Sequence, residues 1–239
     1  MSAIDFWLGR HRDSAARLPG ADLPWLIRLR EDAIDRFADE GWPTTRRENW
    51  RHTSLAFMGQ QALAVREAVT PEAVVAALRA RYQAARGAAQ DAAQRGTESA
   101  PGSAPGSAPG SAPGSAPQSA SKDGHWVVFV DGHFAPALSA IGGLPGGVHI
   151  GSLADALAQT PEKVEAAFGQ AGDGEAPAAL NAALAADGAW IRLGRGVAVE
   201  PPIHLVFIDA TAADQHLRNL IVAEAGAQAT IVEHYPAGA

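Results

Sequence analysis

The first part of the chain carries apolar residues at the spacing of an amphipathic helix. Asp22 suits the N-cap position, Pro24 falls in the first turn, and Gly41, with a proline two positions later, ends the pattern. The apolar positions in between are Leu23, Ile27, Ile34 and Phe37. A second helix is predicted to begin at Thr70, with proline at its first helical position, and to run toward Arg86. We therefore expect an N-terminal helical region over residues 1–86.

The next stretch, residues 87–122, differs in kind. From Ala100 to Ser115 the sequence Ala-Pro-Gly-Ser occurs four times in succession. Glycine and serine add chain flexibility, and no large apolar side chain is available for a core. This composition predicts a disordered Ala/Pro/Gly/Ser-rich insert that acts as a plain linker.

Strand and helix patterns then alternate. The predicted elements are a buried strand at residues 126–130 closed by the turn pair Asp131-Gly132, short helices that begin at Ser152 and Thr160, and a third helix over residues 177–186 that ends at Asp187-Gly188. We expect residues 123–188 to form a mixed strand and helix connection.

From residue 189 onward, short strands follow one another with brief corners. Ile191 and Leu193 are predicted to face one way and Trp190 and Arg192 the other. Further along, both faces are mostly apolar: Ile203, Leu205 and Phe207 lie on one, and His204, Val206 and Ile208 on the other. Two more strands are predicted over residues 217–223 and 228–234.

Corners this short leave no room for the crossover helix that parallel neighbours in an open sheet require. Two architectures stay open: an antiparallel meander or sandwich, and a β-solenoid in which each strand pairs with the next coil. The strand centres near 191, 204, 221 and 231 suggest no strict repeat. Because the sequence stops without a capping coil, either a partner chain covers that end or the rest of the protein is missing. We expect residues 189–239 to be the front part of a core that is truncated.

Charge and composition exclude several classes of function. The chain has no cysteine and a net charge of −7, and residues 123–239 hold thirteen acidic residues against four basic ones. That half would repel a phosphate backbone, so no nucleic-acid partner is expected. The arginines at 46, 47 and 51 surround Glu48 and indicate a solvated face. No stretch is apolar enough for a membrane span or a signal peptide, so we expect a cytoplasmic protein.

The candidate chemical residues are scattered. Six histidines lie on or beside strands: His125, His133, His149, His204, His216 and His234. None has a tight ligand spacing, and the adjacent Glu233 and His234 would point to opposite faces of a strand. Ser152 is explained as a helix cap, and the glycine-rich residues 142–147 lack the lysine of a phosphate-binding loop. Trp42 and Trp50 are expected to pack against the helices or a partner. We predict no catalytic, cofactor-binding or metal-binding residue.

Residues 41–55 carry the sequence Gly-Trp-Pro-Thr-Thr-Arg-Arg-Glu-Asn-Trp-Arg-His-Thr-Ser-Leu. This segment resembles the N-terminal signature of SufD, in which Gly-x-Pro-Thr precedes Glu-x-Trp-[Lys/Arg]-[Tyr/His]-Thr. The segments at 179–188, 191–205, 218–222 and 227–235 are similar to the core that SufB and SufD share. Residues 41–55 are therefore what favours SufD.

The resemblance implies a right-handed parallel β-helix core, incomplete here, in a mainly β, α+β chain with a helical N-terminal region. It implies a non-enzymatic scaffold of the SUF iron–sulfur cluster assembly complex, with a SufB-like scaffold and a SufC-like ATPase as partners. The cluster would be assembled by the complex, and this chain would bind no cofactor itself, because the family's cluster-site histidine lies beyond residue 239.

The alternative is a β-helix enzyme acting on polysaccharide, which needs clustered carboxylates with a basic residue on one strand face. The strand region offers only Arg192, Glu200 and Glu233 at unrelated positions.

Overall fold

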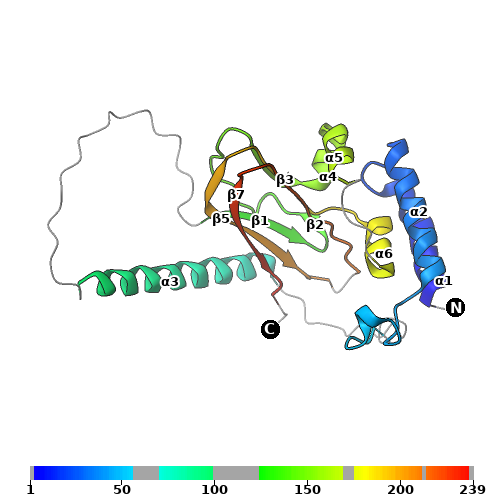
Figure 1. Ribbon diagram of the computed structural model, residues 1–239, viewed down its shortest axis with the longest axis horizontal. Coiled ribbons are helices and arrows are strands. Elements are labelled where there is room, and N and C mark those ends of the chain that lie inside the picture. Colours follow the sequence, from blue (N-terminus) through cyan, green and yellow to red (C-terminus); the bar gives the residue numbers. More distant parts are fainter. Residues whose placement is uncertain (1–2, 56–69, 99–123, 169–174, 212–213, 237–239) are drawn as a thin grey trace.

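The computed structural model describes residues 3–55, 70–98, 124–168, 175–211 and 214–236, which form two β-sheets with helices on their outer faces (Figure 1). The helices are α1 (Ala3–Ser14), η1 (Ala15–Arg17), α2 (Pro24–Glu40), η2 (Glu48–Trp50), α3 (Pro71–Glu98), α4 (Leu153–Gln159), α5 (Pro161–Phe168) and α6 (Ala176–Leu184). The strands are β1 (His125–Val130), β2 (His133–Phe134), β3 (Val148–Ser152), β4 (Ala189–Leu193), β5 (Ala198–Ile208), β6 (Leu220–Ala223) and β7 (Gln228–His234). The predicted mixture of helices and strands, an α+β chain, is confirmed.

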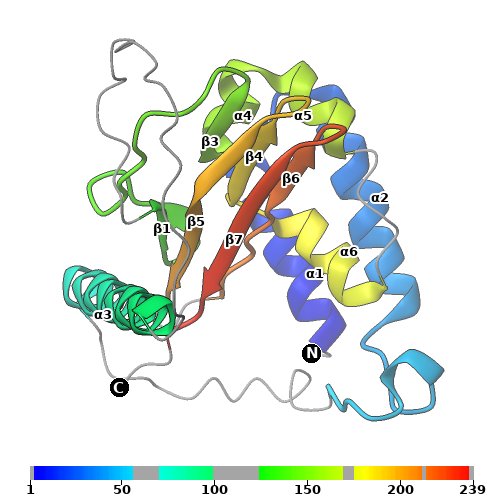
Figure 2. The same cartoon turned by 60° about the vertical axis from the view of Figure 1, so that its left-hand side comes forward.

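The two sheets have different strand orders. The four-stranded sheet runs β2-β1-β5-β7 and the three-stranded sheet runs β3-β4-β6. Strands β1, β5 and β7 are parallel to one another, as are β4 and β6, whereas β2 and β3 pair antiparallel with their neighbours. Figure 2 shows β6 beside β4 and β7 beside β5, so that from β4 to β7 consecutive strands lie in different sheets.

A 30-residue offset relates the last four strands. Trp190 is opposite Leu220 in one sheet, and Ala198 is opposite Gln228 in the other. The corners between the strands also repeat, because Gly196 and Gly226 both have positive φ, at 68° and 78°. This parallel pairing rules out an antiparallel meander for these strands.

The pairing joins alternate strands and not consecutive ones, and it has no strict period, in agreement with the uneven strand centres. A bulge in β5 between Val199 and Ile203 shortens the offset from 30 to 28 residues, so that Ile203 is opposite Ile231. Two prolines, at 201 and 202, lie inside this irregularity. Proline has no backbone N–H to donate to a ladder, which accounts for its place at the bulge.

The main apolar core lies between the two sheets. Its buried members come from strands of both sheets: Val127, Phe129, Ile150, Ala189, Ile191, Leu193, Val199, Ile203, Leu205 and Phe207. The predicted alternation is confirmed here, since Ile191 and Leu193 join this core while Trp190 packs with the helices on the opposite face of β4.

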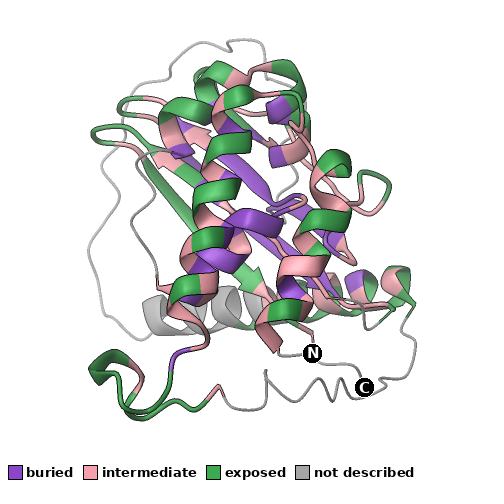
Figure 3. Cartoon of the chain, turned by 90° about the vertical axis from the view of Figure 1, so that its right-hand side faces the viewer, coloured by how far each residue is buried: buried purple, intermediate pink, exposed green. Residues whose placement is uncertain are grey.

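Helices cover the outer faces of both sheets. The first turns of α3 pack through Val75 and Leu78 on the outer face of the four-stranded sheet, and the rest of α3 extends past the strands (Figure 1). Helices α4 and α5, with part of α2, cover the outer face of the three-stranded sheet. Helices α1, α2 and α6 pack together beside the sheets, with their buried residues turned inward (Figure 3).

Some predicted helix boundaries hold and others do not. Ser152 caps α4 as predicted, its hydroxyl oxygen accepting a hydrogen bond from the Asp155 N–H. Asp22 is not the N-cap of α2: Leu23 takes that position without a side-chain hydrogen bond, and Pro24 fixes the first helical residue instead. Helix α3 does not end at Arg86 but continues to Glu98, since alanine, glutamine and arginine favour helix. The rest of the predicted insert, residues 99–122, lies outside the described residues.

Within the described part of the chain, the structure contains no helix long and apolar enough to cross a membrane.

Candidate functional site: a histidine pair on the outer strands

Two histidines meet on the outer face of the four-stranded sheet. His204 lies on β5 and His234 on β7, and the direct partner of His234 in this pairing is Val206. His204 is two residues from Val206, so its side chain lies on the same face as that of His234, one diagonal step away. Nδ1 of His204 and Nε2 of His234 are 2.9 Å apart, within hydrogen-bond distance.

Aromatic rings enclose this pair. The Trp126 ring of β1 stacks on His204 with 4.2 Å between centroids and lies 5.7 Å from the His234 ring, within 15° of parallel to each. Tyr82 of α3 meets His204 edge-on at 4.4 Å. Arg79, one helical turn before it, places its guanidinium 5.5 Å from the Trp126 ring. The His204 side chain has no exposed surface as a result.

Burial keeps both imidazoles neutral. Burial, with a smaller contribution from the neighbouring His234, lowers the pKa of His204 to about 4. Burial also lowers the pKa of His234. Nε2 of His204 has no hydrogen-bond partner among the described residues and lies against Gly124, where a Cβ would come within 3.0 Å of it. The site can hold one hydrogen bond between two neutral rings but offers no compensation for an added positive charge.

The other histidines do not join this pair. His125 is buried and its Nδ1 accepts a hydrogen bond from the Gly142 N–H. His216 packs edge-on against Trp7, and His133 and His149 are exposed on β2 and β3. Among the described residues, no three histidines, cysteines or carboxylates gather closely enough to hold a metal ion.

The outer strand carries a second group of polar side chains. Glu233 accepts hydrogen bonds from the Asn219 side chain at 3.1 Å and from the Tyr235 hydroxyl at 2.8 Å. Partial burial and this carboxylate raise the pKa of Tyr235 to about 12. The Tyr235 ring stacks on Phe207 but is still 68% exposed, and Ile221 on β6 is 45% exposed. The outermost strands of both sheets therefore present large apolar side chains on the surface.

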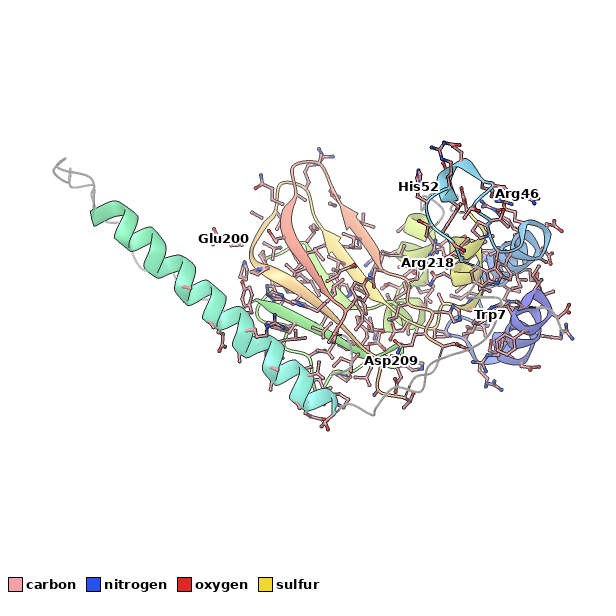
Figure 4. All side chains as sticks on the ribbon, turned by 90° about the horizontal axis from the view of Figure 1, so that it is seen from below. Trp7, Arg46, His52, Glu200, Asp209 and Arg218 are labelled. Atoms are coloured by element: carbon pink, nitrogen blue, oxygen red, sulfur yellow. The ribbon has the colours of Figure 1, made fainter. Side chains whose placement is uncertain are left out.

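The three residues considered for carbohydrate chemistry are not brought together. Arg192 pairs with Glu224 at 3.6 Å in the three-stranded sheet. Glu233, in the four-stranded sheet, is taken up by the hydrogen bonds just described. Glu200 is exposed on β5, beside the strands (Figure 4). These three residues therefore form no shared carboxylate and base site.

Residues 41–55 form an ordered, exposed loop beside α6. Trp42 packs edge-on against Phe37 of α2, as expected for it, and Asn49 donates a hydrogen bond to the Glu175 carboxylate at 2.8 Å. Arg46 and His52 point outward from this loop, away from the strands (Figure 4). The arginines at 47 and 51 form ion pairs with Glu40 and Glu48, which fits the solvated face that the sequence indicates.

Asp187 links several elements in a way that the sequence did not reveal. Its buried carboxylate accepts hydrogen bonds from the Ser152 hydroxyl, the backbone N–H groups of Ala154 and Gly188, and the Phe134 N–H. The sequence indicated only a helix end here. A buried aspartate before a strand requires donors, but the pattern does not say which segments provide them.

The contact between His204 and His234 was also missed. The two histidines are 30 residues apart in the sequence, whereas the pairing in this part of β5 joins residues 28 apart, so the repeat alone does not place them together. The signal available in the sequence is the alternation along both strands, which puts His204 on the same face as Val206, the partner of His234.

Two comparisons with known proteins show which proteins this chain resembles. Residues 121–205 match the family model described as the SufBD protein N-terminal region. An iron–sulfur cluster assembly SufBD family protein of Synechocystis sp. is 35% identical over 115 residues, which are 46% of this chain and 25% of that protein. The match therefore spans about a quarter of the relative's length. Both similarities support the SufB/SufD family, and neither distinguishes SufD from SufB.

Proposed function

We propose that this chain belongs to a non-catalytic scaffold of iron–sulfur cluster assembly. The observation that carries the proposal is the family match over residues 121–205, which includes β1, both short helices after β3, β4 and most of β5. The Synechocystis relative is an iron–sulfur cluster assembly SufBD family protein, and the similarity of this chain to it supports the same role.

The strand arrangement is suited to assembly. From β4 to β7, consecutive strands alternate between two sheets and pair with residues 28 to 30 positions further along, an arrangement typical of a parallel β-helix. We infer that β4 with β5, and β6 with β7, form two successive turns of such a core. The surface of β6 and β7 carries Ile221 and Tyr235 as exposed apolar side chains, and exposed apolar side chains of this size favour a protein contact.

The finer assignment is a SufD-like subunit of the SUF system in the cytoplasm. The segment at 41–55 supports it, because this exposed loop carries the SufD-like signature outside the region that the family model covers. The expected partners are a SufB-like scaffold and a SufC-like ATPase. The iron–sulfur cluster is then the product of the complex, and this chain supplies shape and contact surface.

The competing function, a β-helix enzyme acting on polysaccharide, has little support. Arg192 and Glu233 lie in different sheets, and Glu200 is exposed on β5. Glycoside hydrolysis needs two carboxyl groups on either side of one bond, separated by roughly 5–9.5 Å.

The proposal is tested by depleting the protein that contains this chain in its own cells. We expect aconitase and other iron–sulfur enzymes to lose activity while enzymes without clusters keep theirs, and the wild-type gene to restore them. Unchanged iron–sulfur enzymes on depletion, or polysaccharide cleavage by the purified protein, would favour the competing function.

A further inference from the structure

The end of β7 is held to the sheet by few polar side-chain contacts. In the four-stranded sheet β7 pairs with β5 alone, and the last paired positions are Leu205 with Glu233 and Val206 with His234. The hydrogen bond between Nδ1 of His204 and Nε2 of His234 joins the side chains of these two neighbouring strands. We propose that the two histidines form a proton-sensitive latch that fixes the end of β7 on the sheet while both rings are neutral.

The buried nitrogen of His204 decides how the latch is protonated. Nε2 of His204 has no partner among the described residues, and a buried N–H without an acceptor is rarer and costlier than a bare lone pair. The ring therefore carries its proton on Nδ1 and donates it to Nε2 of His234, 2.9 Å away. His234 in turn carries its own proton on Nδ1. The geometry thus fixes the tautomer of both rings.

An added proton breaks this arrangement. Protonated His234 bears a hydrogen on Nε2, which then faces the N–H of His204, so that two donors oppose each other. If His204 instead moved its proton to Nε2, it would leave a buried N–H without an acceptor against Gly124. With His234 protonated, either tautomer of His204 therefore costs free energy: one loses the hydrogen bond between the rings, and the other buries an N–H without an acceptor.

The surroundings do not relieve the added charge. Helix α3 contributes Tyr82 and the cationic Arg79, whose Nη2 is occupied by the Leu138 carbonyl oxygen at 3.1 Å. Strand β1 contributes the Trp126 ring, whose face gives limited help to a cation. On β7, Glu233 points to the opposite face, toward Asn219 and Tyr235.

Acidification is therefore expected to loosen the end of β7 before the rest of the sheet. The exposed Tyr235 follows directly, and its ring stacks on Phe207 with 5.1 Å between centroids. Since β7 provides part of the surface assigned above to assembly, the latch would couple that surface to pH. The latch itself rests only on residues of this chain and is tested without any partner, so its failure would leave the proposed function standing.

The test is hydrogen exchange of the full chain at pH 7.5 and pH 5.5, corrected for intrinsic exchange rates. A histidine with an ordinary pKa near 6.5 in the open state shifts the opening equilibrium about tenfold at pH 5.5. We expect protection of residues 231–234 to fall by about that factor, with β1 and β4 unchanged. His234→Gln removes one of the two titrating rings, so its pH effect should be clearly smaller than that of wild type, because the glutamine oxygen accepts from His204 without titrating. His133→Gln, an exposed histidine on β2, is the matched control and should behave as wild type.

Imidazole ¹⁵N chemical shifts of the wild-type chain provide an independent check that needs no variant. They should show Nδ1–H on both His204 and His234 at pH 7.5. A proton on Nε2 of His204, or equal pH dependence in wild type and His234→Gln, would overturn the latch.

Discussion

At Gly188 the chain passes directly against the backbone of Arg218, in the following turn of chain, and Gly188→Ala tests that approach. A Cβ at residue 188 would overlap the carbonyl oxygen of Arg218 and lie 2.9 Å from its nitrogen. Both obstacles are backbone atoms, so no side-chain rotation removes the clash. The turns must separate locally, and the chain there must move.

The cost follows from the hydrogen bonds that join the turns at this point. The Arg218 N–H donates to the Asp187 carbonyl oxygen at 2.9 Å, and the Ala189 N–H donates to the Asn219 side chain at 2.9 Å. Breaking each leaves a polar group unpaired at a cost of about 1–3 kcal/mol, so we expect a total of about 3–5 kcal/mol in the free energy of unfolding.

Urea unfolding followed by far-ultraviolet circular dichroism measures this change. With an m-value of about 2–3 kcal/mol/M, the midpoint should fall by roughly 1–2 M. Gly146→Ala is the matched control, because a Cβ at residue 146 meets nothing within 4 Å, and its effect should stay within about 0.5 kcal/mol. Equal midpoints for the two variants would refute the stacking of these turns.

Three further predictions address the polar groups. Because burial lowers the pKa of His204 to about 4, the unfolded chain binds more protons than the folded chain between about pH 6.5 and 4, so stability should fall by about 2 kcal/mol from pH 7 to pH 5. Urea midpoints at the two values measure this, and a flat profile would contradict it. Asp187→Asn replaces one acceptor oxygen by an NH₂ group that faces a backbone N–H, so it should lower the free energy of unfolding by about 3 kcal/mol. Asp155 is exposed in the first turn of α4, so Asp155→Asn is the control and should leave the urea midpoint nearly unchanged. Tyr82→Phe leaves Tyr235 as the one tyrosine of the sequence, so an ultraviolet titration of this variant follows the pKa of Tyr235, which should lie well above the ordinary value of about 10. Adding Glu233→Gln should lower that pKa, and an unchanged pKa would show that Glu233 does not cause the shift.

Local features of this fold could be predicted because local chemistry determines them. Asp131 and Gly132 have positive φ values of 48° and 81°, as their place between β1 and β2 requires. Ser152 has a hydroxyl at the position where α4 needs an acceptor. The alternation of Trp190 and Ile191 between two faces follows from the pleat of a strand.

Pairing between distant segments could not be predicted in the same way. Whether β5 pairs with its chain neighbour or with β7 depends on contacts 28 to 30 residues apart, and both faces of β5 are apolar enough for either choice. The histidine pair depends on that pairing, and the Asp187 carboxylate depends on how β2 and the start of α4 are placed, so their partners are seen only once the strands are in place. The start of α2 was predicted wrongly for a local reason: Asp22 was expected to cap the helix with its side chain, but Leu23 is the N-cap and Pro24 fixes the first helical residue.

The most direct test of the proposed role is native purification of the protein that contains this chain, tagged at its own genomic locus, with co-purifying proteins quantified by mass spectrometry. A scaffold of iron–sulfur cluster assembly should bring down a SufB-like protein and a SufC-like ATPase in amounts comparable to its own. An untagged strain provides the background. If neither protein is enriched over that background, while the tagged protein is intact and abundant, the scaffold role is contradicted.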